Sequence, residues 1–370
     1  PDNPELLEAK RSGIPILTWQ EFMGKYLEKD KFVIAVCGTH GKTTTTSMIG
    51  QLLEDAGLDP TVEVGAIVPK WGTNYRLGKS QYFITEADEF NDNFLVTHPN
   101  ITICTAIEMD HPEYFKDFNA YKESFKKFLN QTKEKIIVNL SDRGVKEVIQ
   151  DMQGEALQKK GRPCHARGGL AQAQVLDYSE KLIDFPLQIP GHHNILNASA
   201  AFQVGLALGI DPEIIKKSLI NFTGVGRRFE KVGEVNGAEI YSDFAHHPTE
   251  IKVTLEGAHE KFPDKKMVLV FQPHMFSRTK ALFDDFVSVL KNSPADQTYI
   301  LDIFPSREVD TGLINTQQLV DAIDKESVYY INSYNKLLNL LSQKIREDNI
   351  VIFMGAGDNH KLALKLVSNT

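Results

Sequence analysis

The sequence contains few cysteines and no long apolar run. Cysteine occurs at three of 370 positions, Cys37, Cys104 and Cys164, which are too few and too scattered for a disulfide framework or a thiolate zinc site. Cys37 and Cys104 lie inside apolar runs typical of strands, so we expect them to pack in a core. No apolar stretch approaches the roughly 20 residues that span a bilayer, and the start, PDNPELLEAKRSG, lacks the features of a signal peptide. We therefore expect a cytoplasmic protein without a membrane segment.

The sequence also lacks an excess of positive charge. It has 41 Lys and Arg residues against 49 Asp and Glu residues, a formal net charge of -8. A nucleic-acid binder normally concentrates positive charge on one face, so we expect no nucleic-acid partner and no helicase-type role. With 42% hydrophobic and 24% charged residues, the chain has an ordinary globular composition and enough length for two or three packed cores. The oligomeric state stays open.

The first half of the sequence alternates short apolar runs with helical patterns, which predicts a parallel sheet covered by helices. The apolar runs are FVIAV, YFIT, ITICTAI and KIIVNL. Helices are expected over the periodic segment from Met48 to Ala56, over residues 118–129, and from NILNASAAFQ onward. We expect this central α/β domain to span residues 31–224.

A change of pattern near residue 221 predicts a second domain over residues 225–370. The stretch NFTGVGRRF breaks the periodicity with two glycines and an arginine pair. A hairpin with an Asn-Gly turn follows, EKVGEV-NG-AEIYSDF. Beyond it, the runs MVLVF, TYILDI, VYYI and IVIFM alternate with helical patterns at residues 278–291, 316–323 and 334–345. This alternation predicts a Rossmann-like α/β domain.

The stretch VCGTHGKTTTT, which begins at Val36, has the features of a phosphate-binding loop. It follows an apolar strand and precedes a helix, whose free N–H groups and dipole favour an anion. Gly38 and Gly41 would let the backbone approach phosphate oxygens, and Lys42 could reach the terminal phosphates. The Thr43 hydroxyl is placed for a magnesium ion. Val36 stands where the standard pattern has glycine, and we interpret it as part of the strand. The alternative is a glycine-rich turn of purely structural use.

Two strand ends carry groups suited to bind a metal ion beside this loop. EADEFND, residues 86–92, follows the YFIT run and holds four carboxylates, and Met109-Asp110-His111 follows ITICTAIE. Ligands in α/β folds bind at the carboxyl ends of strands, and magnesium is commonly held by one or two carboxylates plus substrate phosphates. The alternatives are a solvated acidic loop and a histidine that is merely packed or exposed.

Two strand ends in the second domain carry acidic, basic and imidazole groups. YSDFAHHP contains Asp243, His246 and His247, and FQPHMFSRTK contains His274 and Arg278. Each segment alone could be a hydrogen-bonded loop. Together they predict a polar surface at the same kind of sheet edge as the phosphate loop.

Together the motifs resemble those of the Mur ligases, ATP-dependent enzymes of peptidoglycan precursor synthesis. GTHGKTTTTSMI, EADE, the Asp-His pair, PGHHNILNASAA, GVGRRFE, DFAHHPTEI, FQPH, RTK and the final MGAGD occur in that family's order. The resemblance covers nearly the whole chain and is closest to the members that join L-alanine to UDP-N-acetylmuramate. In this family the phosphate loop reads GTxGKT, so Val36 is no defect.

The family has three domains, which bind the UDP-sugar, ATP and the amino acid in chain order. Residues 1–30 look like only the tail of the first domain and a linker. With most of that domain missing, the resemblance implies that the chain binds ATP but lacks UDP-sugar binding and turnover by itself.

The resemblance also implies roles for individual residues. Those expected around ATP are Gly38, Thr39, His40, Gly41, Lys42, Thr43, Thr44, Asn194, Asn197, Arg228 and Asp243. One magnesium ion is expected on Thr43 and Glu86, and His111 is similar to the ligand of a second. Those expected near the amino acid include His246, His274 and Arg278. Those expected to act in catalysis are Lys42, Glu86, His111 and His246.

The implied reaction is amide-bond formation through an acyl phosphate. The muramate carboxylate attacks the γ-phosphate of ATP, and Mg²⁺ and Lys42 offset the repulsion between negative groups. The amine of the amino acid then displaces phosphate. Because the substrates come from different domains, we expect the domains to close over the site.

The sequence departs from the family pattern beside His274. The usual L-alanine ligase motif PHRYxRT reads PHMFSRT here, so Met275 stands in place of a basic residue, and Phe244 stands where tyrosine is usual. Arg307, which follows a strand of the second domain, is the alternative partner for the carboxylate of the amino acid. The amino acid or peptide that is added therefore stays open.

Three alternative functions remain at this point. A muropeptide ligase, which adds a tripeptide to the same sugar, shares GTHGKTTT and EADE but differs after EADE. A folylpolyglutamate synthase shares the mechanism but fits the AHHPTE and QPH segments poorly. A nucleotide-dependent binding module without enzyme activity is the alternative from a different class.

Overall fold

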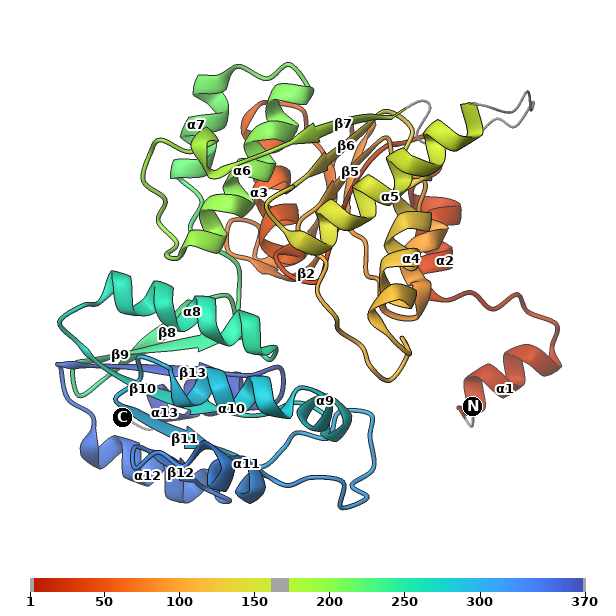
Figure 1. Cartoon of the computed structure of the whole chain (residues 1–370). Helices are drawn as coiled ribbons and strands as arrows, with labels where there is room; N and C mark the ends of the chain where they lie inside the picture. The colour runs from red at the N-terminus through yellow and green to blue at the C-terminus, as the bar shows by residue number, and fades with distance from the viewer. Residues whose placement is uncertain (1–2, 161–172, 369–370) are drawn as a thin grey trace.

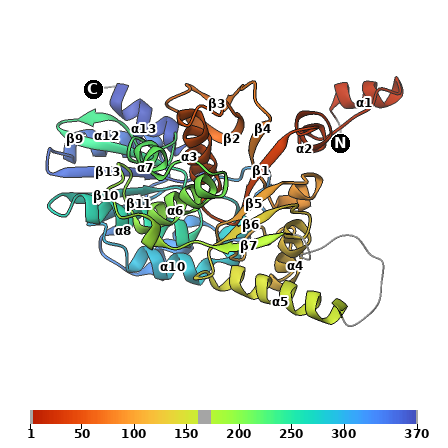
Figure 2. The ribbon, with the colours of Figure 1, turned by 90° about the horizontal axis from the view of Figure 1, so that it is seen from above.

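The computed structural model describes residues 3–160 and 173–368, and these contain two sheets, one in each half of the chain (Figure 1). Cys164 lies outside the described residues. The first described element is helix α1 (Pro4–Arg11), which stands apart from both sheets (Figures 1 and 2). It is followed by α2 (Trp19–Phe22) and the short helix η1 (Met23–Leu27).

Within the described residues the first sheet has seven strands, and every neighbouring pair is parallel except β2 and β3, which are antiparallel. Their order across the sheet is β3 (Thr73–Arg76), β2 (Thr61–Val68), β4 (Tyr82–Glu86), β1 (Phe32–Cys37), β5 (Ile101–Cys104), β6 (Lys135–Val138) and β7 (Gln174–Asp177). Along β1, Ile34 and Val36 belong to one hydrophobic core, whereas Ala35 and Cys37 belong to another. Because both faces of this strand are buried, its sequence is a continuous apolar run.

Helices cover both faces of the first sheet (Figures 1 and 2). One face is covered by α3 (Lys42–Asp55), α6 (His192–Ala207) and α7 (Pro212–Ile220), and the other by α4 (Phe118–Leu129) and α5 (Arg143–Lys160). The connections contain the short helices η2 (Phe90–Val96) and η3 (Glu180–Leu182). The helix predicted over residues 118–129 is confirmed, and Asp117 caps it by accepting the Ala120 N–H at 2.8 Å.

The second sheet has six strands, and all but β8 run parallel to their neighbours. Their order is β12 (Val328–Tyr330), β11 (Gln297–Ile300), β10 (Lys266–Phe271), β13 (Asn349–Met354), β9 (Ala238–Asp243) and β8 (Glu230–Val235). The predicted hairpin is formed by β8 and β9. Its turn residues Asn236 and Gly237 have φ of 51° and 80°, as a tight turn between two strands requires.

Helices also cover both faces of the second sheet. One face is covered by α8 (Pro248–Lys261), α10 (Phe283–Lys291) and α11 (Thr316–Ile323), and the other by α12 (Tyr334–Lys344) and α13 (Asn359–Ser368). The single helix predicted over residues 278–291 is wrong. It is two helices, α9 (Phe276–Ala281) and α10, because Leu282 leaves the helical conformation with φ of -106° and ψ of 27°. Leu282 and Phe283 instead pack against the core beneath α10.

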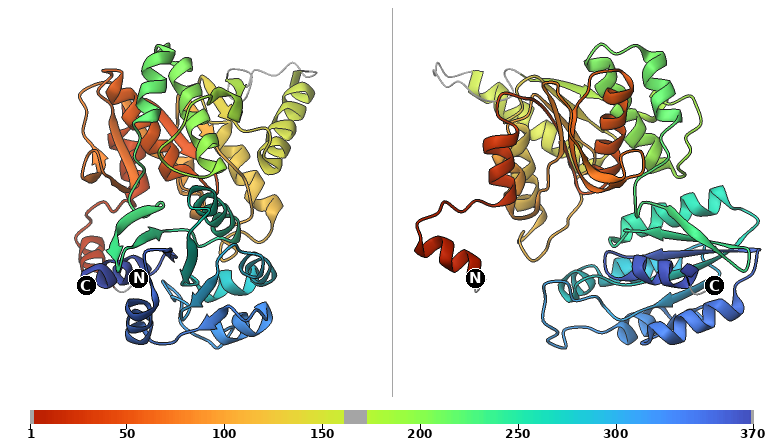
Figure 3. Two further views of the ribbon diagram at one scale, coloured as in Figure 1. Left: turned by 90° about the vertical axis from the view of Figure 1, so that its left-hand side faces the viewer. Right: turned by 180° about the vertical axis from the view of Figure 1, so that it is seen from behind.

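Residues 221–229 connect the two halves, which meet beside the phosphate loop. Helix α8 lies on the side of the second sheet that faces the first half (Figures 1 and 3). Direct hydrogen bonds join the halves, for example from the Gly226 N–H to the Ile67 carbonyl at 2.8 Å. In residues 3–160 and 173–368, no helix has the length and apolar character needed to cross a membrane.

Candidate active site

The phosphate loop lies between β1 and α3, as the sequence predicts. Gly38 and Gly41 have φ of 128° and 82°, a region that favours glycine. A Cβ at Gly38 would collide with Thr105, and one at Gly41 would lie 2.5 Å from the Asn197 Oδ1. Among the residues that the structure describes, no side chain caps the N-terminus of α3. The loop backbone therefore packs closely against Thr105 and Asn197. The first N–H groups of the helix remain available to an anion.

Lys42 forms a buried ion pair at the start of α3. Its Nζ donates to the Glu89 carboxylate at 2.8 Å and to the Gly38 carbonyl at 2.6 Å. Burial lowers the pKa of Lys42, but Glu89, Asp88 and Glu86 together outweigh burial and raise it. Lys42 is therefore charged at any physiological pH and is held by protein groups. Sequence analysis missed the role of Glu89.

Thr43 and Glu86 meet as predicted. The Thr43 hydroxyl donates to one Glu86 carboxylate oxygen at 3.1 Å, and the Gly65 N–H donates to the other at 2.6 Å. Burial raises the pKa of Glu86, while Gly65 and Lys42 act to lower it. Two oxygen ligands beside an uncapped helix N-terminus fit a Mg²⁺ ion shared with phosphates.

A second group of ligand atoms includes Glu89, the ion-pair partner of Lys42. Asp88, Glu89 and His111 can each offer one ligand atom, and the three atoms lie within 4.8 Å of one another. His111 contacts Glu113, with 3.3 Å between its Nδ1 and the Glu113 Oε1. Burial lowers the pKa of His111, but Glu113 and Asp110 outweigh burial and raise it. These oxygen-rich groups fit a second hard cation. The resemblance implied His111 as its ligand, and the sequence predicted a metal role for the carboxylates of residues 86–92 without assigning Asp88 or Glu89 to this ion.

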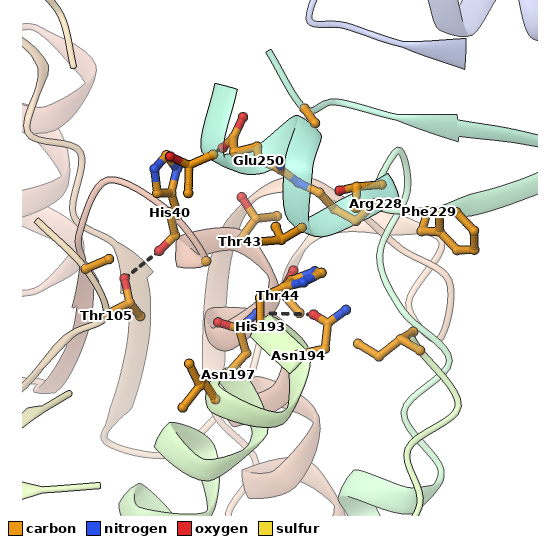
Figure 4. Close-up of a pocket in the computed structure, with 18 of the residues that line it drawn as sticks. His40, Thr43, Thr44, Thr105, His193, Asn194, Asn197, Arg228, Phe229 and Glu250 are labelled. Atoms are coloured by element: carbon orange, nitrogen blue, oxygen red, sulfur yellow. Dashed lines mark hydrogen bonds and ion pairs between the residues drawn. The ribbon is translucent and has the colours of Figure 1, made fainter. Parts of the chain in front are cut away.

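A cavity of about 350 Å³ opens between the phosphate loop, α6 and the second half of the chain (Figure 4). The predicted residues that line it are His40, Gly41, Thr43, Thr44, Asn194, Asn197, Arg228 and Asp243. Asn194 is held by the Pro190 carbonyl at 2.6 Å and itself accepts from the Asn197 amide at 3.2 Å. His193, Phe229 and Glu250 also line this cavity, and sequence analysis missed them.

Asp243 fixes the backbone of the second half beside this cavity. Its two carboxylate oxygens accept the Phe229 and Ala245 N–H groups, each at 2.7 Å. Burial raises the pKa of Asp243 to about 6, against the lowering effect of Arg228. Arg228 lies over the Phe244 ring, 5.1 Å from its centroid, which orients the guanidinium toward the junction of the two halves.

A second cavity of about 450 Å³ lies on the far side of the phosphate loop. The predicted residues that line it are Thr39, Gly41, Lys42, Thr43, Glu86, His111, Arg228, His246, His274, Arg278 and Arg307. The two cavities share Gly41, Thr43, Arg228 and Glu250. A nucleotide in the first cavity would therefore present its terminal phosphate to whatever occupies the second. Of the predicted residues, Gly38 alone lines neither cavity.

Arg278 is engaged by the protein in this second cavity. Its Nε and Nη2 donate to one Asp110 oxygen at 3.1 and 2.9 Å, and its side chain is 3% exposed. Burial alone would raise the pKa of Asp110, but Arg278 holds it far below its usual value. The resemblance implies that Arg278 lies near the amino acid. In the structure Arg278 joins the two halves through Asp110.

His246 and His274 are neutral at physiological pH. Burial lowers the pKa of His246 to about 4 and that of His274 to about 3. The Nδ1 of His246 lies 3.0 Å from the Phe244 carbonyl, which can only accept. Nδ1 therefore carries the proton, and Nε2 keeps a lone pair that can accept one.

Arg307 and Met275 lie in the same cavity. Arg307 pairs with Glu113 and stacks on Phe90, 4.3 Å from the ring centroid, and its side chain is 49% exposed. Met275 is buried and has φ of 68° at the start of α9. The guanidinium of Arg307 is therefore more accessible than that of Arg278.

Comparisons with known proteins identify relatives of both halves of the chain. Residues 36–205 match the Mur ligase middle domain, and residues 227–357 match the Mur ligase glutamate ligase domain. The chain is 40% identical to the UDP-N-acetylmuramate–L-alanine ligase of Alkaliphilus metalliredigens, over 99% of this chain and 82% of that protein. It is 39% identical to the protein of the same name from Caldicellulosiruptor saccharolyticus, over 97% and 81%. The solved UDP-N-acetylmuramate-alanine ligase of Thermotoga maritima is similar with a TM-score of 0.75 and 25% identity, over 100% of this chain and 82% of that one.

Proposed function

The chain belongs to the Mur ligase family, and we propose that it joins L-alanine to UDP-N-acetylmuramate, with hydrolysis of ATP to ADP and phosphate, in peptidoglycan precursor synthesis. The observation that carries the proposal is the junction of two cavities at the phosphate loop, at Gly41, Thr43 and Arg228. The names of the relatives at 40% and 39% identity supply the substrates. Because the reaction consumes ATP, we assign it to the cytoplasm.

We further assign each part of the chain to one substrate. Residues 31–224 form the ATP-binding domain, residues 225–370 form the amino-acid domain, and residues 1–30 belong to the end of the UDP-sugar domain and a linker. ATP takes the smaller cavity, with its adenosine against Asn194 and Asn197 and its phosphates along the first turn of α3. Asp243 and Arg228 complete this site from the amino-acid domain.

The residues of the phosphate end fit two Mg²⁺ ions. Thr43 and Glu86 would hold one ion, and His111 with Asp88 and Glu89 would hold the other. The ions would offset negative charge between the γ-phosphate and the attacking carboxylate. Lys42 adds a permanent positive charge at the same place, and its contact with Glu89 keeps the charge in position before ATP arrives.

The reaction then has two steps. A carboxylate oxygen of UDP-N-acetylmuramate attacks the γ-phosphorus, which forms an acyl phosphate and releases ADP. The amine of L-alanine attacks the acyl carbon and displaces phosphate. His246 lines the cavity where the amine enters, and its free Nε2 takes the proton that the amine must lose. Arg307 binds the carboxylate of the amino acid, in place of the basic residue absent at Met275.

Phosphate release by the complete protein tests this function. The assay contains UDP-N-acetylmuramate, ATP and Mg²⁺, with L-alanine, glycine, L-serine or a tripeptide offered in turn. Release is expected to be stimulated most by L-alanine. Stimulation by the tripeptide alone would assign the chain to muropeptide ligation instead, and stimulation by none of them would refute the proposed acceptor or nucleophile.

A further inference from the structure

His40 lies between carboxylates from the two halves of the chain. Its Nε2 is 2.9 Å from the Glu108 Oε2 in the first half, and its Nδ1 is 3.2 Å from the Glu250 Oε1 on helix α8 in the second half. Its backbone carbonyl accepts a hydrogen bond from Thr105 (Figure 4). An imidazole with an acceptor at each nitrogen satisfies both only when it is protonated. The side chain therefore acts as a charged bridge.

The partners of His40 are themselves fixed. Glu250 accepts the His246 and His247 N–H groups at 3.0 and 3.3 Å, so its carboxylate is tied to the start of α8. Glu108 also accepts the Thr249 hydroxyl at 2.8 Å, which is a second contact across the junction. The bridge thus links the first turn of α8 to the phosphate loop, two residues before Lys42.

We propose that His40 is a positioning residue that holds the two domains closed around ATP by bridging Glu108 and Glu250. This inference depends on one part of the proposed function, namely that ATP binds at the phosphate loop. Closure itself can be measured without any substrate.

The bridge makes closure dependent on pH. Burial lowers the pKa of His40, but hydrogen bonds with Glu108 and Glu250 outweigh burial and raise it from 6.5 to about 9. Since the bound proton stabilises the closed state, this stabilisation is complete below pH 6.5 and is lost as pH rises through about 9. Glu108 lies in the same half as His40 and stays beside it in the open state, so the part of the rise that Glu250 causes is the part that links the proton to closure. The charged or titratable groups that face His40 are Glu108, Glu250, His247, His193 and Asp142, and Arg228 acts on its partner Glu250.

Small-angle scattering of the complete protein tests the bridge, with and without a non-hydrolysable ATP analogue. The radius of gyration of the unmodified protein is expected to rise as pH increases from about 6.5 to above 9. His40→Asn is expected to give the expanded form at every pH, and so is Glu250→Gln, which acts from the other domain. Both variants should raise the dissociation constant of the ATP analogue at pH 6.5 by at least about 10-fold, and the difference from the unmodified protein should become smaller above pH 9. His259→Asn, an exposed histidine on the same helix, is the control.

Two results would overturn the proposal. One is a compact His40→Asn protein with the pH profile of the unmodified protein. The other is a pH-dependent expansion that persists in Glu250→Gln. Circular dichroism verifies that each variant is folded, and a misfolded His40→Asn would leave Glu250→Gln as the deciding variant. Either result would refute the bridge without changing the phosphate release of the unmodified protein at pH 6.5. Failure of the bridge can therefore be distinguished from failure of the proposed function.

Discussion

Lys42 and Glu89 form an ion pair in which the Glu89 side chain is 1% exposed. In Lys42→Met, the Glu89 charge stays buried without its partner, and we expect the free energy of unfolding to fall by about 3 kcal/mol. The double variant Lys42→Met, Glu89→Gln removes the charge as well and should recover most of that loss. Both variants should release phosphate at least about 100-fold more slowly than the unmodified protein, because the positive charge at the phosphates is gone.

Urea unfolding and phosphate release separate these two effects. If Lys42→Met were as stable as the unmodified protein, this result would contradict the expected contribution of the Lys42–Glu89 ion pair to stability. An active double variant would contradict the assignment of Lys42 to the phosphates.

His246 is neutral because burial lowers its pKa to about 4. We expect His246→Asn to slow amide formation by about 100-fold, since a positioned base is lost, while the acyl phosphate still forms. Trapping the acyl phosphate with borohydride, beside an assay of the amide product, measures both steps. Because the pKa of His246 is about 4, the ratio of the rates of amide formation by the unmodified protein and by His246→Asn should be constant above about pH 5. Loss of acyl phosphate in this variant would instead place His246 in the first step.

Helix α3 is flanked by two glycines, Gly41 and Gly57, which differ in their surroundings. Gly41 and Gly57 lie at opposite ends of α3 with φ of 82° and 76°, so alanine is strained at either position, at a cost of about 1 kcal/mol. A Cβ at Gly41 would also meet Asn197, whereas a Cβ at Gly57 would have no atom of the described residues within 4 Å. We therefore expect Gly41→Ala to weaken ATP binding by at least about 10-fold and Gly57→Ala to leave it unchanged.

Isothermal titration with ATP, together with thermal unfolding of both variants, checks this difference. Equal effects on ATP binding would mean that backbone strain alone, and not the close approach to Asn197, decides the shape of the loop.

Burial explains which elements the sequence predicts. Strands β1, β5, β10 and β13 are buried on both faces and appear as apolar runs. Strand β3, TNYR, lies at a sheet edge with no buried residue, and no apolar pattern marks it. The break at Leu282 is also unmarked, because residues 276–291 contain no proline or glycine and Leu282 itself packs against the core.

At the scale of the whole molecule, motifs predict which residues form the site, and long-range contacts decide what each one does. The phosphate loop, Glu86 and His111 come from sequence patterns whose positions along a parallel sheet place them together. No pattern pairs His40 with Glu250, which is 210 residues away, or Arg278 with Asp110, which is 168 residues away. Both pairs join the two halves of the chain, so the closed arrangement could not be predicted from either half.

The proposed function requires both cavities to form one site, in which a carboxylate in the larger cavity attacks the γ-phosphate at Thr43 and Arg228. The most direct measurement uses UDP-N-acetylmuramate labelled with ¹⁸O in its carboxylate, incubated with the complete protein, ATP, Mg²⁺ and L-alanine. An acyl phosphate passes one carboxylate oxygen to phosphate, so mass spectrometry should find one ¹⁸O in each phosphate released together with amide product. Amide product with unlabelled phosphate, or labelled phosphate without product, would contradict the claim.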